Sequence, residues 1–224
     1  MPTATIDEIA IADEPDRWVS LGFTLTGEVC QIGAVRLHFS GSRSGRGIVG
    51  WSLREVTSSE LDGLTTSISE RPLPTPAPTH PNGVSAIDHV VVFSPAFERS
   101  VGALQSAGLD LRRVRQQPTP AGAPRQAFFR LGHEILELVQ QPDELVERSG
   151  GREGPALFWG LALLVEDLDR TVELLGEHVG EPRAAVQAGR RIATVRRSAG
   201  LSLPLALMGS AERPERARED AVTS

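Results

Sequence analysis

The chain has 224 residues, of which 40% are hydrophobic and 23% charged, and its formal net charge is −6. These values are ordinary for a globular protein and allow one large domain or two small ones. No apolar run approaches the ~18 residues that a membrane-spanning helix needs. The arginines are scattered rather than clustered, so neither a membrane nor a nucleic acid is a predicted partner.

All 23 basic residues are arginine, and the chain contains no tyrosine. This composition removes Schiff-base lysines, tyrosine general acids and the lysine of a phosphate-binding loop. The acid–base candidates that remain are five histidines and the carboxylates. The single cysteine, Cys30, excludes an internal disulfide and fits a reducing compartment. The N-terminal segment has no basic region typical of a signal peptide, so the expected location is the cytoplasm.

Residues 71–83 contain five prolines within ten residues and predict an extended linker. The linker separates an N-terminal unit (residues 1–70) from a C-terminal unit (residues 84–210). A glycine-rich break divides the second unit into modules 84–147 and 155–210. The tail, residues 211–224, is polar and charged, which predicts disorder.

Three segments begin with similar apolar runs, each followed by a short helix, a glycine and further strands. The opening runs are residues 6–11, 87–92 and 159–165. The predicted helices are residues 15–21, 95–107 and 167–175. The predicted later strands are residues 27–32, 34–39 and 48–53, then 111–115, 126–131 and 134–139, then 183–186, 191–196 and 203–208. One helix against three or four strands, repeated, predicts an α+β fold of βαβββ modules.

His89 and Glu137 each lie on a short apolar strand of the middle unit. One βαβββ unit fits between them, so the two side chains are expected side by side inside a curved sheet. Imidazole and carboxylate are ligands of divalent cations. The alternative is a partly buried histidine that hydrogen-bonds to the glutamate across the sheet.

The strand at residues 87–92, the strand at residues 136–139 and the turn at residues 165–169 together resemble the vicinal oxygen chelate superfamily. This superfamily includes glyoxalase I, extradiol dioxygenases and bleomycin-resistance proteins. The resemblance covers about residues 85–209 and, more weakly, residues 4–56. It implies paired βαβββ modules whose curved sheets form a cup, with a divalent metal (Zn, Ni, Mn or Fe) at its floor.

The resemblance places His89 and Glu137 in the two metal-ligand positions of the second module, with Glu8 as a third candidate ligand. The corresponding positions in the third module are Gly160 and about Ala206, and neither has a side chain that can bind a metal. The cup therefore has at most half of the usual ligand set.

Two functions follow from this asymmetry, and a purely structural or regulatory module with no small-molecule site is the third alternative. The first is a metal-dependent lyase, isomerase or dioxygenase that acts on a small oxygen-rich molecule. The second is a metal-free protein that binds or sequesters a small molecule, as the resistance-type members of the superfamily do.

The candidate ligand-binding residues are Arg125, Phe128, Trp159 and Arg191. Strand alternation would send Arg125 and one of the paired arginines toward a shared surface, where they could bind a carboxylate or phosphate. A solvated arginine on an open sheet is the alternative, as is a core position for the aromatic residues. Three modules leave one unpaired, so the first is expected to pack on another face or to pair across a homodimer axis.

Overall fold

The computed structural model describes residues 3–75, 77–118, 122–148 and 151–210. The predicted tail at residues 211–224 lies outside them. The α-helices are α1 (Pro15–Ser20), α2 (Phe97–Ser106), α3 (Asp143–Arg148) and α4 (Leu168–Leu175). The strands are β1 (Thr5–Ile11), β2 (Val29–Ile32), β3 (Val35–Phe39), β4 (Ile48–Arg54), β5 (Thr66–Ile68), β6 (Val84–Ser94), β7 (Asp110–Arg115), β8 (Gln126–Leu131), β9 (Glu134–Gln140), β10 (Leu157–Val165), β11 (Arg183–Ala184), β12 (Arg190–Thr194) and β13 (Leu205–Ser210).

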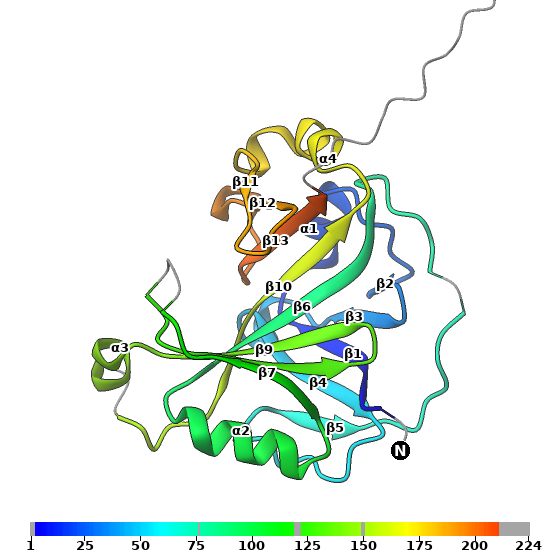
Figure 1. The fold of residues 1–224 in the computed structure, drawn as a ribbon. Helices are drawn as coiled ribbons and strands as arrows, with labels where there is room; N and C mark the ends of the chain where they lie inside the picture. Colours follow the sequence, from blue (N-terminus) through cyan, green and yellow to red (C-terminus); the bar gives the residue numbers. More distant parts are fainter. Residues whose placement is uncertain (1–2, 76, 119–121, 149–150, 211–224) are drawn as a thin grey trace, which may run out of the picture.

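The strands form two sheets, and the α+β fold predicted from the sequence is confirmed. The larger sheet has the order β11-β12-β13-β10-β6-β9-β8-β7, which is two βαβββ modules joined edge to edge. In each module the first and last strands are parallel, β6 with β9 and β10 with β13. Helices α2 and α4 lie at opposite ends of this sheet (Figure 1).

Local signals explain where these helices begin and end. The Asp167 side chain accepts a hydrogen bond from the backbone N–H of Arg170 and caps the start of α4. Gly176 and Gly108 follow α4 and α2 with φ values of +52° and +94°, which residues with a Cβ rarely adopt. These two glycines were predicted helix ends, and the structure confirms them.

A pseudo-two-fold axis relates the two modules of the large sheet. The antiparallel pair β6–β10 is centred where Val90 lies opposite Leu161, and equivalent bulges interrupt both strands. His89 precedes Val90 as Gly160 precedes Leu161, so these two residues are counterparts.

The last strands follow the same symmetry. Glu137 on β9 pairs with Val91, and Ala206 on β13 pairs with Ala162. Because Val91 and Ala162 are counterparts, Ala206 occupies the position of Glu137. The register therefore supports the repeat alignment expected from the sequence.

The N-terminal sheet has the order β2-β3-β1-β4-β5 and repeats this plan in shortened form. The prediction that residues 48–53 form the last strand of one N-terminal module is wrong. Strand β3 is the parallel partner of β1, whereas β4 pairs antiparallel with β1 as β10 pairs with β6. Strand β5 runs parallel to β4, so β4 and β5 are the first and last strands of a fourth, truncated module.

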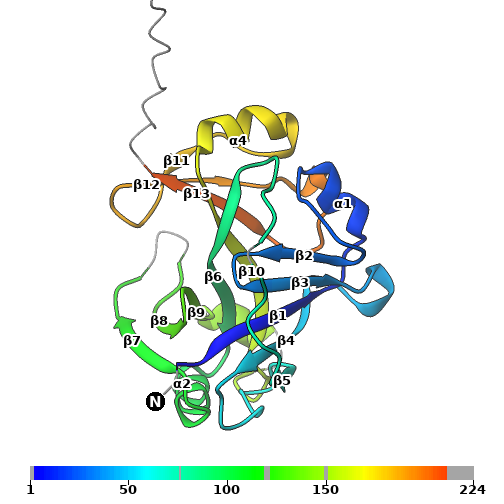
Figure 2. The ribbon, with the colours of Figure 1, turned by 90° about the vertical axis from the view of Figure 1, so that its right-hand side faces the viewer.

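The two sheets share one continuous hydrophobic core. Buried residues of both sheets belong to a single cluster, and the Trp51 ring meets the Phe158 ring edge-on at 5.2 Å. Figure 2 shows the N-terminal sheet, in blue and cyan, beside the long strands β6 and β10. No helix in the described part of the chain is long and apolar enough to cross a membrane.

Candidate functional site

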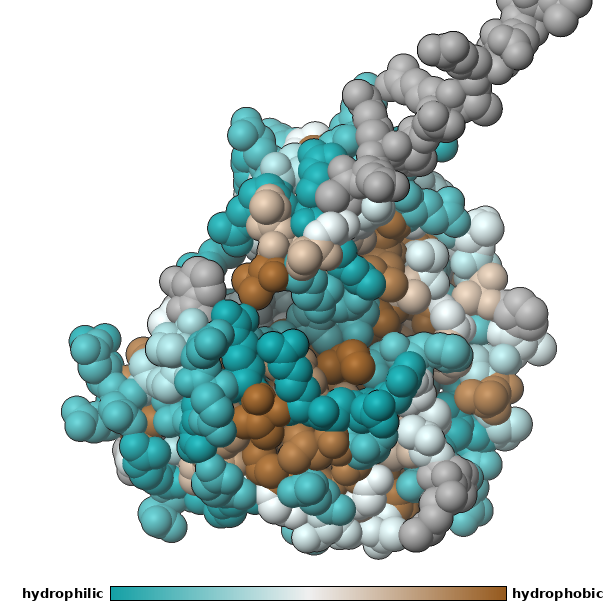
Figure 3. Space-filling model, viewed as in Figure 1, coloured by the Kyte–Doolittle hydropathy of each residue, from teal (hydrophilic) through white to brown (hydrophobic). Residues whose placement is uncertain are grey.

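The concave face of the large sheet, called the cup below, encloses an open cavity of about 1150 Å³. Both modules contribute to its wall, and its volume suits an organic molecule of substantial size. Figure 3 shows the hollow between the module at the top of the view and the module at the lower left.

His89 and Glu137 meet at the cup, as their predicted strands imply. His89 Nε2 lies 3.4 Å from Glu137 Oε2, and both side chains are about 15% exposed. The Gln126 amide donates a hydrogen bond to the other oxygen of Glu137.

Asp88 extends this polar chain on the far side of the imidazole. Its carboxylate lies 2.7 Å from His89 Nδ1 and 2.6 Å from an Arg190 nitrogen. Burial raises the pKa of Asp88, but the hydrogen bonds and charges of His89 and Arg190 outweigh burial and hold it below its ordinary value. Asp88 therefore stays ionised and fixes the orientation of the His89 ring.

Two side-chain carbonyl oxygens have no hydrogen-bond partner within the described residues. They are Oε1 of Gln126 and Oε1 of Gln141, both buried, and both residues line the cup. Buried acceptors are normally paired, so these two side chains leave hydrogen-bonding capacity unused at the wall of the cup.

The donor set of the cup does not fit a resident divalent metal. No group of three or more histidine, cysteine or carboxylate side chains could hold an ion within the ranges that the structure describes. Gly160 has no side chain to bind a metal, and the backbone leaves no room for one, because a Cβ on Gly160 would lie 2.4 Å from the Pro204 carbonyl oxygen. Ala206 offers only a methyl group, so His89 and Glu137 stand without a second pair.

The third candidate ligand, Glu8, lies in the N-terminal sheet and does not join His89 and Glu137. Its carboxylate is 2.7 Å from a nitrogen of Arg71. Glu8 was predicted from its alignment with His89, and it fills the equivalent place in the other sheet.

A buried charge cluster occupies that part of the N-terminal sheet. The Asp7 carboxylate is fully buried and forms ion pairs with Arg36, Arg54 and Arg71. Burial raises the pKa of Asp7. The hydrogen bond from the Ser69 hydroxyl and the charges of Arg54 and Arg71 lower it by more, so the net shift of the pKa is downward. The Asp7 carboxylate is thus fully paired with side chains of the same chain. The large sheet is therefore the better place for a ligand.

Of the four predicted ligand-binding residues, Phe128 and Trp159 line the cup. Arg125 does not: its guanidinium bonds to Glu98 and lies over the Phe97 ring at 4.4 Å.

Arg191 also lies away from the cup. It forms a bidentate pair with Asp169 of α4, at 2.8 and 2.9 Å.

The sequence interpretation missed three arginines that do line the cup, Arg113, Arg115 and Arg183. The first two alternate along β7, a pattern that places both side chains on one face. That alternation was the available signal, but a strand-edge arginine is usually solvated.

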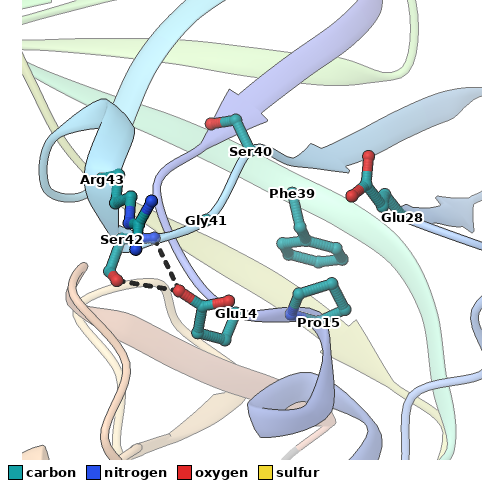
Figure 4. A pocket seen from close by; sticks show the side chains of 8 residues that line it. All are labelled: Glu14, Pro15, Glu28, Phe39, Ser40, Gly41, Ser42 and Arg43. Atoms are coloured by element: carbon teal, nitrogen blue, oxygen red, sulfur yellow. Dashed lines mark hydrogen bonds between the residues drawn. The ribbon is translucent and has the colours of Figure 1, made fainter.

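A smaller pocket of about 280 Å³ lies between β3 and the start of α1 (Figure 4). The Glu14 carboxylate accepts hydrogen bonds from the Ser42 backbone N–H at 2.9 Å and from its hydroxyl at 2.8 Å. These bonds, the backbone one first, lower the pKa of Glu14. The Glu14 carboxylate of this pocket is thus already hydrogen-bonded within the chain, and the larger cup is the better candidate site.

No family model matches the sequence, and the comparison with curated proteins found no match. The fold is similar to that of a variant of 4-hydroxymandelate synthase from Streptomyces coelicolor, with a TM-score of 0.63 and 15% identity over 93% of each chain. It is also similar to a xylose isomerase-like TIM barrel/4-hydroxyphenylpyruvate dioxygenase fusion protein, with a TM-score of 0.63 and 11% identity over 94% of this chain and 50% of that one. At such low identity the likeness concerns the fold.

Proposed function

We propose that this chain, which has the vicinal oxygen chelate fold, binds a small organic molecule in its cup without a metal ion. The observation that carries the proposal is the cavity of about 1150 Å³, to which both modules contribute and whose polar pair, His89 and Glu137, has only Gly160 and Ala206 at the counterpart positions.

The floor and wall of the cup suit an oxygen-rich molecule with an apolar part. Asp88 orients His89, whose ring lies beside the Glu137 carboxylate. The ring pair Phe93 and Trp159, 5.3 Å apart, adds an apolar wall.

A neutral dye tests whether the cup binds small molecules. N-phenylnaphthylamine is expected to gain fluorescence with the parent protein and to lose that gain in Ala206→Trp, because the indole would fill the cavity. The matched control is Leu174→Trp, at a side chain on α4 that is 55% exposed and does not line the cup. Equal dye binding by Ala206→Trp and the parent would refute a ligand site in the cup.

The sequence also suggested a lyase, isomerase or dioxygenase that uses Zn, Ni, Mn or Fe. This function has less support, because Gly160 and Ala206 replace one ligand pair and a side chain at position 160 would meet Pro204. We expect no stoichiometric metal after reconstitution with each ion. One ion per chain that is lost in His89→Ala would establish the metal-dependent alternative.

The homodimer and the cytoplasmic location stay predictions. The dimer was expected because one module lacked a partner, and the antiparallel pairing of β1 with β4 removes that reason. Light scattering that gives twice the 24.0 kDa chain mass would restore it. The single cysteine, Cys30, supports the cytoplasmic assignment.

A further inference from the structure

We infer that the ligand of the cup is an amphipathic anion whose carboxylate, phosphate or sulfonate group is held by Arg113, Arg115 and Arg183. This inference rests on the proposed function, since it names the class of molecule that the cup binds.

The three arginines come from opposite edges of the large sheet. Arg113 and Arg115 lie on β7 and Arg183 lies on β11, the two outermost strands of the eight. All three nevertheless border one cavity, because the sheet curves and brings its edges to the same mouth. The cavity therefore presents guanidinium groups from both modules.

These arginines differ from their neighbours in having no ion-pair partner within the described residues. Arg112, next in β7, pairs with Asp110, and Arg191 on β12 pairs with Asp169. Arg113, Arg115 and Arg183, called the rim arginines below, are therefore available to pair with an anion from outside the chain.

The charge of the cup is opposite to that of the whole chain. The chain has a formal net charge of −6, yet among the residues that the structure describes the cup is lined by three arginines and one carboxylate, Glu137. That carboxylate is already engaged by His89 and Gln126. A local excess of positive charge in a concave site attracts anions and raises their rate of association.

Much of the remaining wall is apolar, and this part of the wall indicates the second half of the ligand. Val91, Val139 and Met208 line the cavity together with the Phe93–Trp159 ring pair. Burying a hydrocarbon or aromatic body there is favourable because it removes apolar surface from water. Fork-shaped guanidinium groups suit the two or three oxygens of the anionic end.

Two dyes that differ by one anionic group test the inference. Anilinonaphthalene sulfonate is N-phenylnaphthylamine with an added sulfonate. The rim variant Arg113→Gln/Arg115→Gln/Arg183→Gln is expected to raise the Kd of the sulfonate at least about tenfold. The Kd of the neutral dye should not change.

The control variant Arg46→Gln/Arg148→Gln/Arg170→Gln removes the same charge from exposed positions that do not line the cup. It is expected to bind both dyes as the parent does. An equal loss of sulfonate binding in this control would overturn the inference, because general charge would then explain the effect.

The outcomes separate the inference from the proposed function. If both dyes bind in the cup but the rim variant weakens them equally, the anion site is wrong and the ligand site stands. If neither dye binds, or Ala206→Trp binds both, the proposed function fails. Displacement of N-phenylnaphthylamine by decanoate or decyl phosphate, but not by decanol, would support the anion site and identify the preferred group. Equal displacement by decanol would count against it.

Discussion

Gly160 and His89 are related by the two-fold symmetry of the large sheet, yet only His89 has room for a side chain. The carbonyl oxygen of Pro204 would lie only 2.4 Å from a Cβ atom on residue 160. This approach fills the space that a second metal ligand would need. The asymmetry between the modules is therefore built into the backbone as well as into the choice of residue.

Gly160→Ala is expected to lower the free energy of unfolding by about 1–3 kcal/mol, because the added methyl group must displace the Pro204 backbone just before β13. The matched control is Gly102→Ala, inside α2, where an added Cβ meets nothing within 4 Å. That change should raise stability by about 0.5–1 kcal/mol. Urea denaturation measures both, and an unchanged Gly160→Ala midpoint would show that position 160 is open to a side chain.

The repeat pattern was sufficient to predict the polar pair of the cup but not its rim. His89, Glu137 and their counterparts follow from the position of each residue within its module. Whether an arginine is free depends on partners that are distant in the sequence. Arg125 fits the expected alternation, but Glu98 of α2 takes its guanidinium. Conversely, Arg113 and Arg115 look like ordinary edge residues until the sheet curves.

At the scale of elements, the proline-rich segment at residues 71–83 is more than a spacer. Its backbone carbonyls accept hydrogen bonds from Gln31 at Thr75 and from Thr24 at Thr79. The Asn82 side chain donates to the Leu21 carbonyl at 2.8 Å. The sequence predicted an extended segment, because prolines exclude helix and central strand. It could not predict that the segment is fastened along the N-terminal sheet.

His80 makes the central contact of this segment. Its Nδ1 accepts a hydrogen bond from the Thr24 N–H, and its Nε2 lies 3.1 Å from the Gln31 carbonyl oxygen. Burial lowers the pKa of His80 below the ordinary 6.5, although the bond to Gln31 opposes the shift. The neutral ring is the form that fits, because a protonated Nδ1 cannot accept from Thr24.

Stability is therefore expected to fall as the pH decreases below about 6.5, the unfolded-state pKa, with a slope of at most about 1.4 kcal/mol per pH unit. The sign follows because the unfolded chain binds a proton at His80 that the folded chain does not. The contribution is fully present above that pH and is lost progressively toward the lower pKa of the folded state.

His80→Gln should flatten this dependence between pH 7 and 5, as followed by urea unfolding at each pH, since an amide can replace both hydrogen bonds without titrating. His133→Gln, at an exposed turn, is the control and should keep the slope of the parent. Identical slopes in all three proteins would show that His80 does not couple pH to stability.

The N-terminal strands show what a strand pattern leaves undetermined. Residues 48–53 read equally well as the last strand of one module or the first strand of another, because both are short, apolar and buried. The choice depends on the direction of β4 relative to β1, and the two strands are antiparallel. Strand β5 has only three residues and two of them are exposed, so no hydrophobic alternation predicted it.

At the scale of the whole molecule, the two sheets are expected to unfold together. The sequence suggests two units joined by a linker, but a single hydrophobic cluster runs through both sheets. Hydrogen bonds also join them, including Ser202 N–H to Asp13 at 2.9 Å and Gly47 N–H to Ser202 Oγ at 2.7 Å. Separating the sheets would expose this core to water.

Leu37→Ala tests this coupling, because Leu37 is fully buried in β3 of the N-terminal sheet. The cavity is expected to cost about 2–5 kcal/mol of unfolding free energy. If the sheets unfold as one unit, hydrogen exchange at Leu136 and Leu138 in β9 should accelerate by the same free energy, although β9 lies in the other sheet. Leu174→Ala, at an exposed position on α4, should leave exchange unchanged. Unaltered exchange in β9 of Leu37→Ala would mean that each sheet is stable by itself.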